Sequence, residues 1–255
     1  MSRAPQISIG RLDEEPYASV LCYPRSDKAE LESRLKELLQ LGVTALQFAG
    51  KKRAFDVAVW GKGCVGLVVI AYRDHEEMAL KIRRVDADRA EMLREAELLK
   101  KANSVNVGPR LLKASRNFML MQFVDGLLFP EWLEKKRSKP RIRKVLRSVL
   151  EQCWQLDAAR LDHGELSRAP KHIMVDQEDR VFIVDFESAS ISRRPANVTS
   201  ACQFLFLGST VANVLSSKLG VRNRALIIAA LKTYKNRRSR RNFRNVLVAV
   251  GLQTT

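Results

Sequence analysis

Cysteine is scarce in this sequence, with four among 255 residues. None of Cys22, Cys64, Cys153 and Cys202 has a partner at CxxC spacing, so the sequence predicts neither a zinc site nor a disulfide framework. A reducing, cytoplasmic environment fits this usage. The first residues contain no apolar core of the kind that a secretory signal needs.

Acidic residues are also in short supply. The 45 Lys and Arg residues outnumber the 28 Asp and Glu residues, which gives a formal net charge of +17. This excess predicts attraction to polyanions such as nucleic acid, although a solvated basic face has the same composition. The imbalance is greatest in residues 220–255, the basic C-terminal region, which contains no acidic residue. For this region, RNA contact and a solvated tail are both open.

One stretch lacks charge altogether. Residues 195–217 are long enough to cross a bilayer. They include several Ser, Thr, Asn and Gln side chains, which make insertion into a membrane costly. We therefore expect a buried helix over about 199–217 and no membrane partner.

The remaining composition, 46% hydrophobic and 29% charged, is typical of a globular chain. A strand is predicted over 18–23. A helix follows over 27–41, with Ser26 as its N-cap and Gly42 as its end. We treat residues 1–42 as an N-terminal extension of one strand and one helix.

Residues 43–124 carry strand signals around a glycine-rich turn. Three apolar runs separated by turns predict an antiparallel sheet, which a helix and two further strands complete. The expected strands are 55–60, 67–72, 78–82, 110–114 and 117–123, and the helix is 89–101.

Gly61, Gly63 and Gly66 lie in GKGCVGLV. Without Cβ atoms they let backbone N–H groups approach phosphate oxygens. A dinucleotide-binding fold would need a helix directly after the glycines, but a strand follows, which favours a glycine flap over a nucleotide. Lys81 ends the third strand, where a lysine either snorkels or pairs with an anion. Glu95, on the next helix, is near enough in sequence to be that anion.

Residues 125–255 are predicted to be mostly helical around one hairpin. Its strands are the apolar runs 173–175 and 181–184. Glu165 and Asp185 stand near its two ends, and such carboxylates suit general-base work and divalent metal binding. An ordinary surface hairpin is the alternative. Helices are expected over 127–137, 141–159, 199–217, 222–234 and 243–252.

Taken in order, these motifs resemble the protein-kinase-like superfamily over residues 55–217. GKGCVGLV is similar to the glycine loop, MALK ends in the nucleotide lysine, and REAELLKKA places Glu95 in the pairing position. FMLMQFVDG resembles the hinge, with Met121 as gatekeeper and Gln122 and Phe123 presenting their backbone to adenine. The set is most similar to RIO-type kinases, to the kinase subunit of the KEOPS complex and to small Ser/Thr kinases of archaeal type.

Two motifs depart from the family pattern. H-R-D-x-x-x-x-N is replaced by HGE, which puts Glu165 where the catalytic Asp is expected and His172 near the metal-binding Asn. D-F-G is replaced by DFE, which begins with Asp185. A glutamate keeps the acceptor chemistry and adds one methylene. Histidine ligates metals, although Mg²⁺ prefers oxygen.

The resemblance implies an α+β, bilobal protein-kinase-like fold, with an N-lobe over 43–124 and a reduced helical C-lobe over 125–255. The implied cofactors are ATP and Mg²⁺ or Mn²⁺, with Asp185 and His172 as metal ligands. The glycines would cover the phosphates and Lys81, paired with Glu95, would hold them. Glu165 would accept the proton of the attacking hydroxyl, and Arg168 or Lys171 would offset charge on the transferred group.

We therefore expect an ATP-dependent phosphotransferase, an atypical Ser/Thr kinase acting on a protein or ribonucleoprotein substrate. A nucleotide-binding pseudokinase that docks on RNA or a ribonucleoprotein is the first alternative, favoured by the net charge and by Glu165 and Glu187. A small-molecule kinase of the aminoglycoside or choline type is the second. The basic C-terminal region disfavours it, because those sites usually have acidic pockets.

Overall fold

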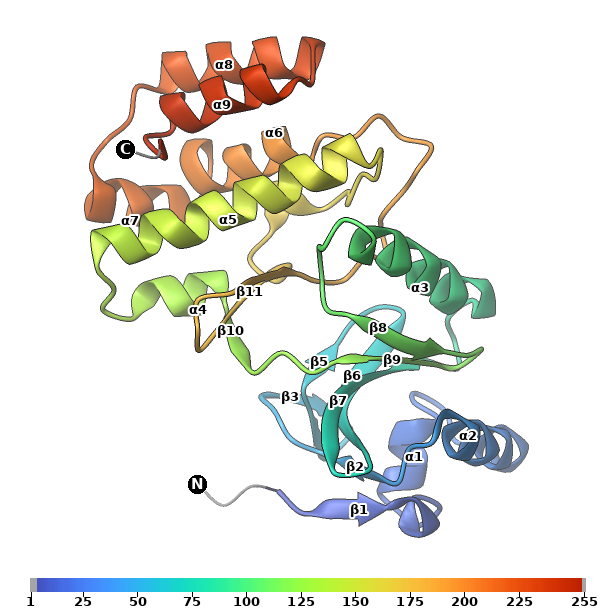
Figure 1. The fold of residues 1–255 in the computed structure, drawn as a ribbon. Coiled ribbons are helices and arrows are strands. Elements are labelled where there is room, and N and C mark those ends of the chain that lie inside the picture. Colours follow the sequence, from blue (N-terminus) through green and yellow to red (C-terminus); the bar gives the residue numbers. More distant parts are fainter. Residues whose placement is uncertain (1–3, 254–255) are drawn as a thin grey trace. The chain divides into compact units, whose positions relative to one another are not determined.

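A computed structural model describes residues 4–253, with the side chains at 89–91 outside that description. The chain forms two compact units (Figure 1). Unit 1 runs through Lys100 and includes Pro109–Phe123, and unit 2 consists of Lys101–Gly108 and the chain from Val124 onward. A sheet dominates the first unit and helices the second, so the α+β, kinase-like class expected from the sequence is confirmed.

The centre of unit 1 is an antiparallel sheet with strand order β1-β2-β6-β7-β9-β8, to which β5 adds by pairing with β6. Its longest ladder joins β6 and β7 from Gly66↔Arg83 to Arg73↔Glu76. The strands are β1 Gln6–Ser8, β2 Ala45–Gln47, β5 Gly61–Lys62, β6 Gly66–Arg73, β7 Glu76–Arg83, β8 Leu111–Ala114 and β9 Phe118–Gln122. The strand expected over 55–60 is present as the shorter β4, Val57–Val59, and it pairs with a strand that was not predicted, β3 Lys52–Ala54, in a hairpin that turns at Phe55, whose φ is 50°.

The helices of unit 1 include one that the sequence did not predict. The expected strand over 18–23 is instead α1, Tyr17–Leu21, because a short apolar run has no periodicity that separates helix from strand. The next helix, α2 Lys28–Leu41, is capped by Asp27, which accepts from Glu30 N at 2.7 Å, rather than by Ser26. It ends at Gly42 (φ 81°), as predicted. Helix α3 spans Arg89–Asn103.

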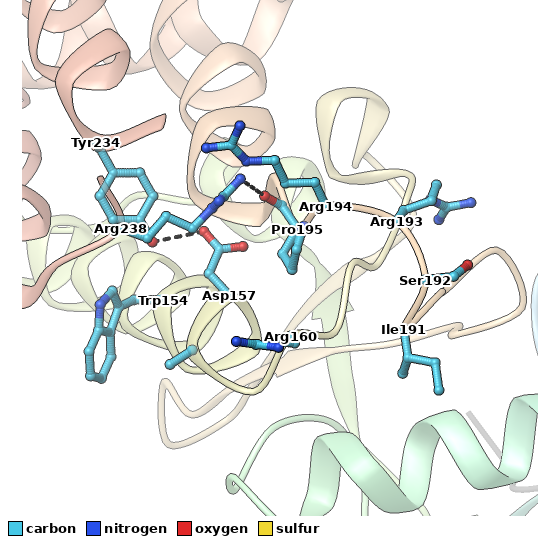
Figure 2. Close-up of a pocket in the computed structure, with 11 residues that line it drawn as sticks. Trp154, Asp157, Arg160, Ile191, Ser192, Arg193, Arg194, Pro195, Tyr234 and Arg238 are labelled. Atoms are coloured by element: carbon cyan, nitrogen blue, oxygen red, sulfur yellow. Dashed lines mark hydrogen bonds between the residues drawn. The ribbon is translucent and has the colours of Figure 1, made fainter. Parts of the chain in front are cut away.

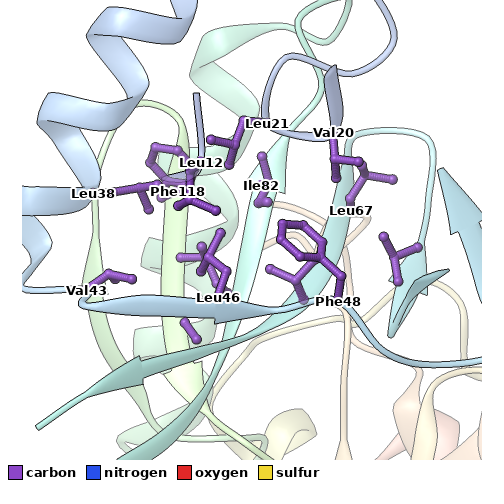
Figure 3. Packing of buried hydrophobic residues seen from close by; sticks show 14 of the residues in the cluster. Leu12, Val20, Leu21, Leu38, Val43, Leu46, Phe48, Leu67, Ile82 and Phe118 are labelled. Carbon is purple, nitrogen blue, oxygen red and sulfur yellow. The ribbon is translucent and has the colours of Figure 1, made fainter. Parts of the chain in front are cut away.

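The core of unit 1 lies where α1 and α2 meet the sheet. Leu21 and Leu38 pack with Leu46, Ile82 and Phe118, and all five are fully or almost fully buried (Figure 3). Burying such side chains stabilises a fold by about 2 kcal/mol each. The N-terminal residues therefore contribute to the same core as the glycine strand and the lysine strand.

A buried polar network ties α2 to the sheet as well. Arg34 donates to the carbonyl oxygens of Leu21 and Arg83 at 2.5 and 2.7 Å. Asn117 Oδ1 accepts from Arg83 at 3.0 and 2.8 Å, while the Asn117 amide groups donate to Glu37. Because the buried charges are hydrogen-bonded, they hold the helix in one register against the strands.

Unit 2 combines a small sheet with a group of helices. Strands β10 Gly126–Leu128, β11 Ile173–Asp176 and β12 Val181–Ile183 pair antiparallel in that order. A strand at 126–128 contradicts a helix starting at 127. Gly126 explains it, since a Cβ there would lie 2.6 Å from Val175 O and only glycine permits this approach. The helices are α4 Phe129–Glu134, α5 Lys139–Ala158, α6 Asn197–Cys202, α7 Thr210–Leu219, α8 Arg224–Asn236 and α9 Arg240–Ala249.

The uncharged stretch does not form one helix. After α6 come a π-helical turn, Gln203–Leu207, and a break at Gly208, and Ser209 then caps α7 by accepting from Ala212 N. In the part of the chain that the structure describes, no single helix has the length and hydropathy of a membrane span, and Asn197–Leu207 with Thr210–Leu219 reach them only as a pair bent by 68°. Helices α8 and α9 pack on each other beyond this stretch (Figure 1).

Candidate active site

The glycine segment of unit 1 is a tight turn between β5 and β6. Gly63 N donates to Gly66 O at 2.8 Å, and Gly61 pairs with Val68. A Cβ on Gly66 would lie 2.7 Å from Ile82 O and 3.2 Å from Lys81 Cγ. Gly66 is therefore required for β6 to lie against the lysine strand, in addition to any role beside a phosphate.

Lys81 and Glu95 form a buried ion pair. Lys81 Nζ lies 2.8 and 2.7 Å from the two carboxylate oxygens of Glu95, and both side chains are at most 7% exposed. Lys81 is held in the middle of the sheet, because β7 pairs with β6 on one side and β9 on the other. The pair fixes an ammonium at the point where α3 meets the sheet, which is the geometry that a phosphate-binding lysine needs.

The hinge-like segment ends β9. Met121 is half-buried and pairs with Ala79 and Leu111. Phe123 packs edge-on against Trp60 with ring centroids 5.0 Å apart. The N–H of Gln122 donates to Arg110 O at 2.8 Å and so completes the sheet, and the role of the Gln122 carbonyl and the Phe123 backbone at adenine stays a prediction.

In unit 2, Glu165 and His172 are brought together by the loop before β11. His172 Nε2 lies 2.9 Å from Glu165 Oε2, and Ser188 Oγ donates a short hydrogen bond to Glu165 Oε1. A carboxylate accepts only, so His172 Nε2 carries the proton of its bond. The buried Nδ1 of His172 has no hydrogen-bond partner within the described residues.

Asp185 lies on the other side of His172. Its Oδ2 is 4.0 Å from His172 Nδ1, and its φ of 69° is unusual for a residue other than glycine. Such strained conformations concentrate at functional sites. The unpartnered nitrogen of His172 and this carboxylate oxygen are near enough to each other that the expected metal role of the two residues stays a prediction.

Buried groups hold this loop in place. His163 donates through Nε2 to Val184 O at 3.1 Å, and burial lowers the pKa of His163 from its usual 6.5 to about 4, so that it is neutral at pH 7. His163 N donates to Asn197 Oδ1, whose amide in turn donates to Asp157 Oδ1 at 2.8 Å. Burial raises the pKa of Asp157, and hydrogen bonds from Tyr234 and Asn197 oppose that shift.

Comparison with known protein families identifies the family to which a chain with this site belongs. The family model described as "RIO domain" matches residues 69–200, just over half of the chain. The chain belongs to the RIO domain family. RIO domains form a family of atypical, kinase-like, ATP-binding phosphotransferases, which the motif order had implied. The "Uncharacterized protein MJ1211" of Methanocaldococcus jannaschii is similar as well, with 26% identity over 101 residues, which are 40% of this chain and 84% of that protein.

Most of the expected site residues fall inside the RIO domain match, but Gly61, Gly63 and Gly66 precede it. Their assignment depends on the local geometry of β5 and β6. Within unit 1 the structure brings Lys81 to Glu95, and within unit 2 it brings Glu165, His172 and Asp185 into one group.

Sequence reasoning missed Ser188 and the buried set Asp157, Asn197 and Tyr234. Ser188 could have been noticed, because it follows Asp185 by three residues in the same segment. Asp157 interrupts the apolar face of α5. A charged residue on such a face indicates a buried carboxylate that is hydrogen-bonded by other parts of the chain.

Proposed function

We propose that this RIO domain is an ATP-dependent Ser/Thr protein kinase. The contact between Glu165 and the Ser188 hydroxyl is the observation that supports it best. A general base must accept a hydrogen bond from the hydroxyl that it activates, and Glu165 already makes this contact with a serine. The longer glutamate side chain thus reaches a hydroxyl despite replacing aspartate.

In this proposal each residue has a defined task. Lys81, held by Glu95, binds phosphate oxygens of ATP beneath the glycine turn. Asp185 and His172 Nδ1 would hold Mg²⁺ or Mn²⁺, which would supply positive charge to offset that of the phosphates. Glu165 removes the proton of the substrate hydroxyl, and the His172 N–H bond to its other oxygen keeps that carboxylate oriented.

The substrate that we propose is a serine or threonine of a protein or ribonucleoprotein. Only eleven residues separate Asp185 from the start of α6 at Asn197, which leaves no long activation segment to seat a peptide. A large partner would supply that platform. The buried, free thiols of Cys22, Cys153 and Cys202 suit a reducing, cytoplasmic setting.

The test is phosphate transfer from labelled ATP with Mg²⁺ or Mn²⁺. Glu165→Gln should lower transfer by about 10²- to 10⁴-fold while ATP still binds, because the glutamine cannot accept a proton. Asp185→Ala should lower transfer as well and weaken the response to metal. Wild-type protein that neither binds ATP nor transfers phosphate would refute the proposal. Binding without transfer would favour the pseudokinase alternative.

Lys81 needs a double variant, because breaking a buried ion pair destabilises a fold by about 3–5 kcal/mol on its own. In Lys81→Met/Glu95→Leu both charges are replaced by apolar side chains. We expect this variant to remain folded and to lose ATP binding. Retained ATP affinity in the folded double variant would remove Lys81 from the site.

A further inference from the structure

Unit 2 contains a pocket of about 570 Å³ that none of the expected catalytic or metal residues line (Figure 2). Its walls come from three parts of the unit. They are the end of α5 with Trp154 and Asp157, the segment 191–195, and the end of α8 with Tyr234 followed by the turn that contains Arg238. The pocket is thus distinct from the group formed by Glu165, His172 and Asp185.

The lining of this pocket is strongly positive. Four arginines line it, and one acidic residue does so. The arginines are Arg160, Arg193, Arg194 and Arg238. The acidic residue, Asp157, accepts hydrogen bonds from Asn197 through Oδ1 and from Tyr234 through Oδ2 at 2.8 Å, so its two oxygens are occupied on the side of the helices. Arg193 is paired with Asp162, so the four arginines still exceed the two carboxylates that face them, and the pocket keeps a net positive charge.

Neutral carbonyl groups hold two of these arginines in position. Arg194 Nη2 donates to Lys235 O at 2.7 Å, and Arg238 Nη2 donates to Pro195 O at 2.5 Å. Figure 2 shows the second of these bonds beside the Tyr234–Asp157 bond. A carbonyl partner orients a guanidinium without cancelling its charge. Arg193 differs, because its Nε donates to Asp162 at 2.9 Å.

The pocket adjoins a larger basic surface on α8 and α9. The contact between Arg194 and Lys235 joins the segment 191–195 to the end of α8. The exposed basic side chains of this surface are Arg224, Lys232, Lys235, Arg237, Arg241 and Arg244. Since residues 220–255 contain no acidic residue, no neighbour along this stretch neutralises them. A ligand with many spaced negative charges fits this surface better than one with a single anionic group.

We propose that the pocket holds a backbone phosphate of an RNA strand that runs over α8 and α9. Guanidinium groups bind phosphate oxygens through paired N–H donors, and arginine side chains are well suited to this geometry. A phosphorylated peptide would use the pocket but would leave the surface on α8 and α9 without a ligand. The inference is independent of phosphate transfer, so it stands or falls separately from the proposed kinase activity.

The experiment measures binding of a fluorescein-labelled 12-nucleotide oligouridine to the full chain by anisotropy, between 50 and 300 mM KCl. The variants are Arg160→Ala and Arg194→Ala. The matched control is Lys144→Ala, which removes the same charge from an exposed position near the other end of α5, about 24 Å from Arg160. Thermal unfolding of each variant shows that it is folded.

We expect each pocket variant to weaken RNA binding about tenfold, as loss of a charge-assisted hydrogen bond does. Each should also make the slope of log K against log salt less steep by about 0.7, the share of one phosphate on a single strand. Lys144→Ala should leave both values near those of the wild type. Equal losses in all three variants would mean a diffuse surface attraction and would overturn the assignment of the pocket.

Binding of a phosphoserine peptide with the same label tests the alternative that the pocket holds a phosphorylated peptide instead of RNA. Peptide binding that depends on Arg160 and Arg194, together with RNA binding that does not, would replace the RNA proposal by a phosphopeptide site. Absence of RNA binding by the wild type at 50 mM KCl would also overturn it.

Discussion

At the scale of single residues, the structure shows which contacts are made by the residues that the kinase resemblance had singled out. Glu165 is held by His172 on one oxygen and by Ser188 on the other. Asp185 takes a positive φ, and the buried Nδ1 of His172 faces it at 4.0 Å. Within the first departure from the kinase motifs, His172, near the expected asparagine, therefore contacts Glu165, at the expected aspartate position, and orients its carboxylate.

His163 should make the stability of the protein depend on pH. Its pKa is about 4 in the folded state and near 6.5 when exposed, because burial disfavours the charged ring. Between these values the unfolded state binds a proton that the folded state does not, so stability falls as the pH drops from about 6.5 to about 4. The loss is about 3 kcal/mol. Urea unfolding at several pH values measures it.

The control for this prediction is the exposed His75. His75→Asn should leave the pH dependence unchanged, and His163→Gln should flatten it even if the variant is less stable throughout. A pH profile of His163→Gln that matches the wild type would assign the dependence to other groups.

Ser188 should limit the availability of Glu165. In Ser188→Ala the carboxylate loses the hydroxyl that competes with a substrate, so kcat/KM for phosphate transfer should rise about fivefold, the equivalent of a hydrogen bond of about 1 kcal/mol. Ser192→Ala, four residues along the same segment, is the control. A fall in kcat/KM in a Ser188→Ala protein of normal stability would show instead that Ser188 positions Glu165 for transfer.

At the scale of elements, the hairpin of β6 and β7 connects the glycine turn to the lysine. Gly63 and Gly66, two of the three glycines in the pattern, look alike in sequence, but a Cβ on Gly66 would lie 2.7 Å from Ile82 O, whereas the nearest atom to a Cβ on Gly63 would be 3.6 Å away. The two positions therefore have different tolerances for a side chain.

Gly66→Ala should consequently destabilise the protein by about 1–3 kcal/mol and displace the strand beside Lys81. Gly63→Ala should change stability much less, because its Cβ makes only ordinary contacts. Denaturant unfolding gives the stabilities, and the thermal shift with ATP reports nucleotide binding. Equal stability of the two variants would contradict the close approach at Gly66.

At the scale of the whole molecule, the two proposed ligands map to different elements. Nucleotide is expected at β6, β7 and α3 of unit 1 and RNA at α8 and α9 of unit 2. An ATP analogue should therefore slow amide hydrogen exchange in β6, β7 and α3. It should leave the exchange rates of α8 and α9 unchanged. Oligouridine should have the opposite pattern. Nucleotide protection confined to α8 and α9 would refute the assignment of Lys81.

The sequence by itself determined the family motifs, their order and the antiparallel sheet. These features depend on local composition and spacing, as in the Gly42 helix end and the apolar face of α5. Tertiary structure alone decided that Tyr17–Leu21 is helical and that residues 199–217 are broken at Gly208. It also decided that Arg34 meets Asn117, and Asp157 meets Asn197, in buried networks. The reason is physical: such contacts join residues far apart in the chain, and their stability comes from burial that no local pattern encodes.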